Sequence, residues 1–253
     1  LNAEAGSGTL RKVEPRLRMM LTLARRAQRQ TSGRFDARTL EVLEGLGERA
    51  QVPYAPGLVP RIAGDAGWIR RTGRDLVSLD TAIDSGGLGK GLGLRWALAA
   101  ALRGTSRLTG LLLEAGGDVA AIGGPVPGGA WQVGIEDPAE PAQVLAVVTL
   151  RDAALATSST SVRRWTGPTG QPVHHLIDPS TWQPADGGLL AVTVVHTDPA
   201  WAEIWSKAYF IAGAAAIGPE ARARGMAVWW VEGDRSFHLT PAAREHTEWL
   251  RDD

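Results

Sequence analysis

The spacing of apolar residues along the chain predicts several amphipathic helices. Apolar positions recur every three or four residues after Leu10 and again after Arg34, and a glycine lies near the end of each stretch. A third stretch, rich in alanine and leucine, follows a glycine-rich segment, and a fourth has the composition of a buried helix. Helices are therefore expected over residues 10–30, 34–47, 94–102 and 200–216.

Other stretches have the shorter, partly alternating pattern that is typical of β-strands. A hairpin is expected from 68–71 and 76–79, while prolines and glycines over 51–75 favour a loop. Further strands are expected over 108–118, where the strand enters a Gly-Gly-Asp turn, and over 130–136, 142–150, 190–196 and 226–232. Helices and strands are interspersed without a regular βαβ repeat, so the predicted class is α+β in a single domain, residues 1–253.

Composition excludes some classes of partner and site but does not identify the function. The 253 residues carry 27 basic and 27 acidic side chains, so no net charge indicates nucleic acid or an anionic membrane as a partner. The arginine-rich face of the first helix is interpreted as a solvated surface. Cysteine is absent, which excludes disulfides and thiolate ligands, and no apolar run is long enough for a membrane span.

The segment Asp84–Gly93 has five glycines and a lysine, a composition that suits an anion. It matches neither the phosphate-loop pattern G-x-x-x-x-G-K-[ST] nor the dinucleotide pattern G-x-G-x-x-G. Glycines nevertheless let backbone N–H groups approach a phosphate closely, and Lys90 supplies a positive charge. Lysine is rare here, because the chain has 24 arginines and only Lys12, Lys90 and Lys207.

Other polar clusters are weak signals when each is taken alone. Gly116-Gly117-Asp118 is ordinary turn chemistry. His174 and His175 could be strand-end histidines with satisfied hydrogen bonds, and no spacing of histidines supports a zinc site. Glu203 and Lys207, four residues apart on one helical face, could form a simple ion pair.

In their order along the chain, these clusters resemble the motifs of the ApbE family, the FAD:protein FMN transferases. The resemblance covers roughly residues 1–218. The matching segments are Gly33–Asp36 (G-x-F-D), Asp84–Gly91 (D-x-G-G-[IL]-[AG]-K-G), Ala115–Asp118 (A-G-G-D), Trp131–Pro138 (W-x-[VI]-G-[IL]-x-x-P), Ala156–Ser158 (A-T-S) and, from His174, the segment His174–Thr181 (H-x-[IL]-[IL]-D-P-x-T).

The resemblance implies a mixed α/β fold with largely antiparallel sheets packed with helices. It also implies that FAD is the substrate and that FMN is moved, with Mg²⁺, to a Ser or Thr hydroxyl of a partner flavoprotein while AMP is released. The catalytic residues would be His175, Asp178 and Lys90. The FAD contacts would be Asp84, Gly86, Gly87, Gly89, Lys90, Gly91, Gly116, Gly117, Asp118, Ser158 and His175.

The metal position departs from the family pattern. Family members commonly carry A-D-x-x-x-T on the late helix, with Asp and Thr as Mg²⁺ ligands beside a carbonyl of the glycine loop. The metal residues would therefore be Gly89, Glu203 and Lys207, but an ammonium cannot ligate Mg²⁺. We expect the Lys207 ammonium to lie where a cation is needed, supplementing or displacing the metal.

Two further departures concern the ends of motifs. Trp182 follows Asp178–Thr181 where the family has glycine. Leu1-Asn2-Ala3 resembles a segment that in the family follows a first pair of strands, so the chain is interpreted as lacking the usual N-terminal segment. That segment would carry any signal, and a cytoplasmic location is favoured without it.

Two alternatives remain open beside the transferase. The first is a protein that binds FAD or FMN without transferring it, because of the altered metal position and Trp182. The second is a scaffold or fragment that binds no nucleotide. FAD binding distinguishes the scaffold from the other two, and AMP release in the presence of an acceptor protein distinguishes the transferase from the flavin-binding protein.

Overall fold

The structure, a computed structural model, describes residues 1–48, 68–73, 75–104 and 108–251. Most of the loop expected over 51–75 lies outside these residues. The chain divides into two compact units, one formed by Leu1–Gly87 and Arg164–Ala185 and the other by Leu88–Arg163 and Asp186–Asp253. We call them unit 1 and unit 2. The single domain expected over 1–253 stays a prediction.

Among the described residues, unit 1 contains small sheets and two α-helices. Its elements are a 3-10 turn (Asn2–Glu4), β1 (Arg11–Lys12), α1 (Pro15–Gln30), α2 (Leu40–Gly45), β2 (Ile69–Thr72), β3 (Leu76–Leu79), β9 (Arg164–Thr166), β10 (Pro172–His174), β11 (Ile177–Asp178) and β12 (Gln183–Pro184). The strands pair in the order β1-β3-β2, with β10-β9 and β11-β12 as separate two-stranded ribbons. The expected hairpin of β2 and β3 is therefore present, and β1 extends it.

Unit 2 holds most of the sheet. Its elements are α3 (Gly89–Gly104), β4 (Gly110–Ala115), β5 (Asp118–Gly123), β6 (Trp131–Glu136), β7 (Val144–Leu150), β8 (Ala154–Ser159), β13 (Leu189–His196), α4 (Pro199–Ala212), α5 (Ala214–Ala223), β14 (Ala227–Glu232), β15 (Phe237–Leu239), α6 (Pro241–His246) and β16 (Thr247–Leu250). One sheet has the order β15-β14-β13-β8-β5-β4 and a second has β16-β7-β6, with all pairs antiparallel.

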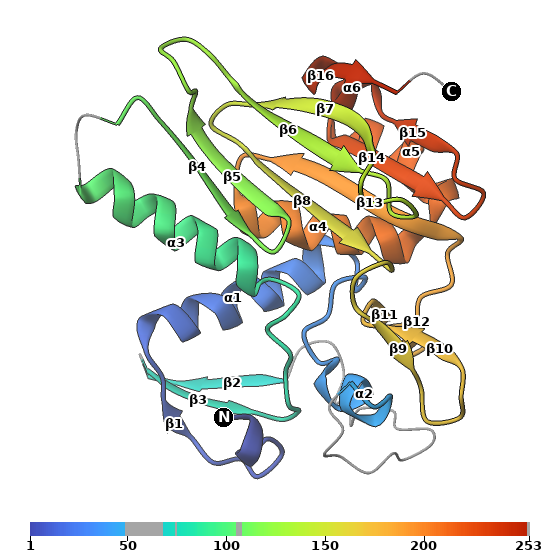
Figure 1. Cartoon of the computed structure of the whole chain (residues 1–253). Coiled ribbons are helices and arrows are strands. Elements are labelled where there is room, and N and C mark those ends of the chain that lie inside the picture. Colours follow the sequence, from blue (N-terminus) through green and yellow to red (C-terminus); the bar gives the residue numbers. More distant parts are fainter. Residues whose placement is uncertain (49–67, 74, 105–107, 252–253) are drawn as a thin grey trace. The chain divides into compact units, whose positions relative to one another are not determined.

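Alternating side chains of the six-stranded sheet form two cores inside unit 2. On one face Ala120, Ala154 and Ala156 pack with Leu94 of α3 and Ala202 of α4. On the other face, neighbours of these residues pack against the three-stranded sheet; this core includes Val119, Ala121, Leu155, Val148 and Leu150. Small alanines on the helix side let α3 and α4 lie close to the strands (Figure 1). The predicted α+β class with largely antiparallel sheets is confirmed.

Several predicted helix bounds were wrong. The first helix begins at Pro15, because residues 11–12 pair with β3 as a strand. The second is only Leu40–Gly45, since residues 34–39 form turns around the buried Asp36. The expected helix over 200–216 is broken at Gly213, whose φ of +78° lies outside the helical region.

Candidate functional site

The glycine segment leads directly into helix α3. Residues 86–88 form a turn and the helix begins at Gly89, five residues earlier than the sequence predicted. Lys90 and Gly91 therefore belong to the first helical turn, where backbone N–H groups lack partners within the helix and the helix dipole favours negative charge. The chemistry of this terminus suits an anion.

Lys90 is held against a buried carboxylate at the start of β5. Its Nζ lies 2.8 Å from Oδ2 of Asp118 and donates to the carbonyl of Gly116 at 3.3 Å. Asp118 Oδ1 accepts from the backbone N–H of Thr157 at 3.2 Å, which ties this carboxylate to β8. The Asp118 side chain is 3% exposed, whereas that of Lys90 is 38% exposed. Lys90 can thus contact a ligand while Asp118 stays enclosed.

The turn before β5 depends on glycine. Gly116 and Gly117 have φ values of +59° and +86°, a conformation that glycine adopts without strain. A Cβ at Gly116 would lie 3.5 Å from Cδ of Lys90, so the side chain of Lys90 runs directly over this turn. The Gly-Gly-Asp turn expected from the sequence is therefore what brings Asp118 to Lys90.

A second lysine and carboxylate pair lies on α4. Oε1 of Glu203 is 3.4 Å from Nζ of Lys207, and its Oε2 accepts from the backbone N–H of Gly91 at 2.8 Å. Glu203 is buried, and this burial raises the pKa of its carboxyl group, while Lys207 and the Gly91 N–H act in the opposite direction. Asp118 raises the same pKa and Lys90 lowers it, so the two pairs form one electrostatic cluster.

Helices α3 and α4 approach each other at Gly91. A Cβ there would lie 2.5 Å from both Cα of Ala200 and the carbonyl oxygen of Pro199, so only glycine fits. Arg95, one turn further along α3, pairs with Asp198 at 2.5 Å, and Asp198 caps α4 by accepting from Ala200 N. These contacts place the Gly91 N–H within hydrogen-bond distance of the Glu203 carboxylate.

Ser158, predicted to contact FAD, lies beside the second pair. Its hydroxyl is 2.8 Å from that of Ser206, which donates to the carbonyl of Glu203 at 3.0 Å. Both serines are buried. The sequence reasoning missed Ser206; its position one residue before Lys207 was the available signal.

Unit 1 contains the remaining predicted residues. Asp84 precedes the turn that contains Gly86 and Gly87, and Asp84 N donates to the carbonyl of Ala37 at 2.7 Å. His174 and His175 follow one another at the end of β10. The structure therefore brings together Lys90, Gly91, Gly116, Asp118, Ser158, Glu203 and Lys207 within unit 2, with Gly89 and Gly117 beside them in the chain.

His174 makes two hydrogen bonds through its ring nitrogens. Nδ1 of His174 accepts from Leu176 N at 3.3 Å, so the proton of the neutral ring is on Nε2, which donates to the carbonyl of Ala185 at 3.1 Å. Both ring nitrogens of His174 therefore have structural partners. Asp178 Oδ1 accepts from the backbone N–H and the hydroxyl of Ser180, both at 2.8 Å, and orders the turn after β11.

Trp182 has a backbone conformation that glycine adopts more easily than other residues. Its φ is +57°, a conformation that costs a residue with a side chain roughly 1–2 kcal/mol. Its ring is buried with Val42, Leu43 and Ile177, and the Arg38 guanidinium lies 6.0 Å from the ring centroid. Burial of the indole offsets the backbone strain.

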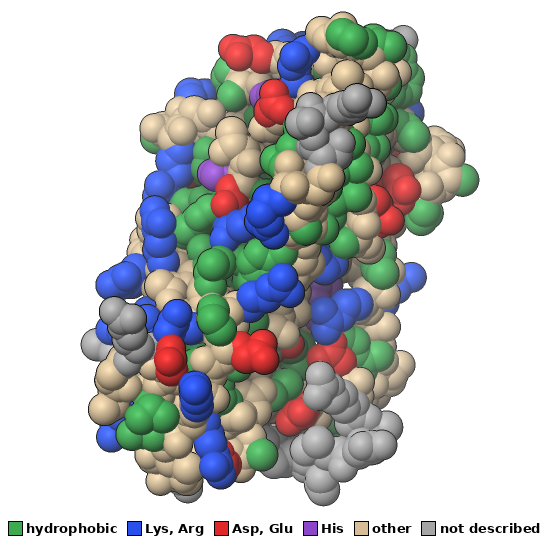
Figure 2. Space-filling view, turned by 90° about the vertical axis from the view of Figure 1, so that its left-hand side faces the viewer, with side chains coloured by type: hydrophobic (Ala, Val, Ile, Leu, Met, Phe, Trp, Pro, Cys, Tyr) green, Lys and Arg blue, Asp and Glu red, His purple; other side chains and the backbone are tan. Residues whose placement is uncertain are grey.

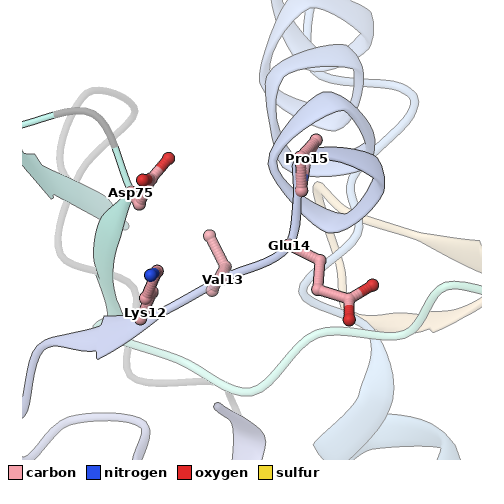
Figure 3. Close-up of a pocket in the computed structure, with 5 residues that line it drawn as sticks. All are labelled: Lys12, Val13, Glu14, Pro15 and Asp75. Carbon is pink, nitrogen blue, oxygen red and sulfur yellow. The ribbon is translucent and has the colours of Figure 1, made fainter.

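One pocket of the described residues contains none of the predicted site residues. A surface pocket in unit 1 is lined by Lys12, Val13, Glu14, Pro15 and Asp75 (Figure 3). Basic and acidic side chains are interspersed with apolar ones on the face in Figure 2. In the described ranges, no cluster of three or more His, Cys, Asp or Glu could hold a metal ion. None of the helices described there is long and apolar enough to cross a membrane.

Comparisons with known proteins agree with the sequence motifs. Residues 1–230 match the model of the ApbE family. An FAD:protein FMN transferase of Rhodobacter capsulatus is 28% identical over 260 residues, covering 98% of this chain and 48% of the relative. One from Escherichia coli strain K12 is 30% identical over 126 residues, covering 49% of this chain and 36% of the relative. The chain thus spans half or less of the length of these curated relatives.

Solved structures show the same fold. The crystal structure of the ApbE protein of Thermotoga maritima matches with a TM-score of 0.83 and 25% identity, covering 99% of this chain and 82% of that one. The apo form of the flavinyl transferase ApbE of Pseudomonas stutzeri matches with a TM-score of 0.74 and 21% identity, covering 96% of this chain and 77% of that one.

Proposed function

Because this chain belongs to the ApbE family, we propose that it is an FAD:protein FMN transferase. It would move FMN from FAD to a Ser or Thr hydroxyl of a partner flavoprotein and release AMP. The named relatives support this activity.

One observation of the structure carries the proposal. Lys90 lies in the first turn of α3, fixed by Asp118 at 2.8 Å and still 38% exposed. A positive charge at the N-terminus of a helix can bind a pyrophosphate by charge-assisted hydrogen bonds, and the helix dipole adds to its attraction. Gly116 and Gly117 leave the space next to Lys90 without side chains, so a phosphate can approach the backbone there.

The proposed step is a single phosphoryl substitution. The acceptor hydroxyl oxygen bonds to the phosphorus of the FMN phosphate, the bond from that phosphorus to the bridging oxygen breaks, and AMP leaves with the bridging oxygen. His175 would take the hydroxyl proton as a general base. Asp178 would order the turn that follows, as its two hydrogen bonds to Ser180 indicate. Lys90 would stabilise negative charge on the phosphate oxygens.

The residues at the expected Mg²⁺ position do not fit that ion. Mg²⁺ requires oxygen ligands in an octahedral shell, and here one of the expected side chains is an ammonium. The second, Glu203, has one oxygen 3.4 Å from Lys207 Nζ and the other on the Gly91 N–H. No step of the reaction is therefore assigned to a metal.

The proposal is tested by transfer of flavin to protein. The chain is incubated with FAD and a soluble protein extract as the acceptor source, and covalently bound flavin is read as fluorescence in a denaturing gel. We expect a fluorescent band with FAD and the release of AMP in equal amount. FMN in place of FAD is the matched control, because it lacks the AMP leaving group. Labelling with FMN, or none with FAD, would contradict the proposal.

The second candidate is a protein that binds flavin without transferring it. The ammonium of Lys207 at the metal position and the strained Trp182 favour it. Tight FAD binding with neither AMP release nor a labelled acceptor would identify this function instead.

A further inference from the structure

We propose that Lys207 takes the place of the divalent cation in this chain, so that FAD is bound and its FMN transferred without Mg²⁺. This inference rests on the proposed function. It concerns the buried pair of Glu203 and Lys207 on α4.

Both carboxylate oxygens of Glu203 already have partners within the protein. Oε2 accepts the Gly91 N–H at 2.8 Å, and Oε1 lies 3.4 Å from the Lys207 ammonium. The carboxylate is 1% exposed, so it cannot swing outward to meet an ion. A metal at Glu203 would compete with the Gly91 N–H and the Lys207 ammonium for these two oxygens.

The positive and negative side chains of the cluster are equal in number. Asp118 and Glu203 bring two negative charges to the cluster, and Lys90 and Lys207 bring two positive ones. The four charges sum to zero, so a divalent cation would find no excess of negative charge in the cluster. A pyrophosphate finds these ammonium groups and the N-terminal dipole of α3 already in place.

Lys207 is more enclosed than Lys90. Its side chain is 16% exposed, less than half the exposure of Lys90, and it is one of three lysines in a chain with 24 arginines. An enclosed ammonium keeps much of its electrostatic effect because solvent screens it little. Lys207 thus supplies an enclosed cation, whereas Lys90 supplies a more exposed one.

The test measures FAD affinity by flavin fluorescence, with EDTA and with millimolar Mg²⁺. The wild type should bind FAD equally in both conditions. Lys207→Thr should bind about 10–100-fold more weakly in EDTA and regain affinity with Mg²⁺, because a hydroxyl ligand replaces the ammonium. Lys207→Met should lose affinity in both, since it has neither charge nor a hard ligand. Lys12→Met, on strand β1 of unit 1, is the matched control, and its FAD affinity should not change.

Binding of Mg²⁺ to the protein is also measured directly. Calorimetric titration of the wild type with Mg²⁺ alone should show no binding, and circular dichroism checks that each variant is folded. If Lys207→Thr does not fold, the wild type with and without Mg²⁺ still decides the question.

The outcomes separate this inference from the proposed function. FAD binding by the wild type that strengthens tenfold or more with Mg²⁺ overturns the inference, while flavin labelling of an acceptor would still support the transferase. Metal-independent FAD binding that depends on Lys207, without labelling or AMP release, supports the metal-free site and contradicts the transferase. A wild type that binds no FAD in either condition overturns both.

Discussion

The cluster of unit 2 and the histidine segment of unit 1 are built in different ways. In the cluster, hydrogen bonds and ion pairs join residues far apart in sequence, such as Gly91 to Glu203 and Lys90 to Asp118. In the segment 174–182, most hydrogen bonds span few residues, as in Leu176 to His174 and Ser180 to Asp178. The cluster therefore depends on the packing of helices and sheet, whereas the segment depends on its own turns.

This difference predicts how substitutions affect each region. A substitution in the cluster disturbs buried charges that compensate one another, so binding and stability should change together. A substitution in the histidine segment should change chemistry while most of unit 1 stays folded. The following four predictions separate these two behaviours.

The largest effect is expected in the histidine segment. His175→Ala should lower flavin transfer by roughly 10²–10⁴-fold, because a general base is lost, and should leave FAD affinity nearly unchanged. Transfer is measured as covalent flavin fluorescence and affinity by titration. His174→Ala is the matched comparison, and it should lower stability more than transfer, since both its ring nitrogens hold backbone groups. The reverse result, with turnover lost only in His174→Ala, would exchange their roles.

The next effect concerns Lys90 in the cluster. Lys90→Ala should weaken FAD binding by about 10–100-fold, because a charge facing the pyrophosphate is removed. It also leaves the buried Asp118 carboxylate without its cation, so the free energy of unfolding should fall as well. Lys12→Ala is the control. Equal FAD affinity in Lys90→Ala and the wild type would remove the glycine segment from the binding site.

The sequence could predict the local parts of this arrangement. The glycine segment, the Gly-Gly-Asp turn and the position of Glu203 and Lys207 on one helix all follow from short motifs. Their residues are close in sequence or share a helical period, so local chemistry decides them. The α+β class also followed, because strand and helix patterns alternate irregularly along the chain, whereas the antiparallel sheets were expected from the resemblance to the family.

The long-range contacts could not be predicted in the same way. Ser206 bonds to Ser158 across 48 residues, and Gly91 N–H reaches Glu203 across 112, neither of which leaves a pattern in the sequence. Residues 34–39 looked helical by spacing, but the buried ion pair of Asp36 and Arg38 holds them in turns. In such places tertiary contacts override local propensity.

The third prediction tests the packing of the cluster. Gly91→Ala should lower the free energy of unfolding by about 1–3 kcal/mol, because its Cβ would meet the backbone of Ala200 at 2.5 Å. Gly93→Ala on the same helix has open space around its Cβ and should raise stability by about 0.5–1 kcal/mol. Urea denaturation measures both. Equal stability of the two variants would mean that α3 and α4 do not need this close approach.

The smallest effect is expected at His196, which supports the start of α4 from the end of β13. Its Nδ1 accepts from Asp198 N at 2.9 Å, which requires an unprotonated Nδ1, and Asp198 caps the helix. Burial lowers the pKa of His196, against the opposing effect of the Asp198 carboxylate. Its folded pKa lies below its unfolded value, so the unfolded chain binds the proton first as pH falls. The stability from neutral His196 is thus complete above about pH 6.5, the ordinary histidine pKa, and is lost as pH falls through the lower folded value. His196→Gln should reduce this pH dependence in urea denaturation series, and an unchanged pH profile would show that proton binding at His196 is not coupled to folding.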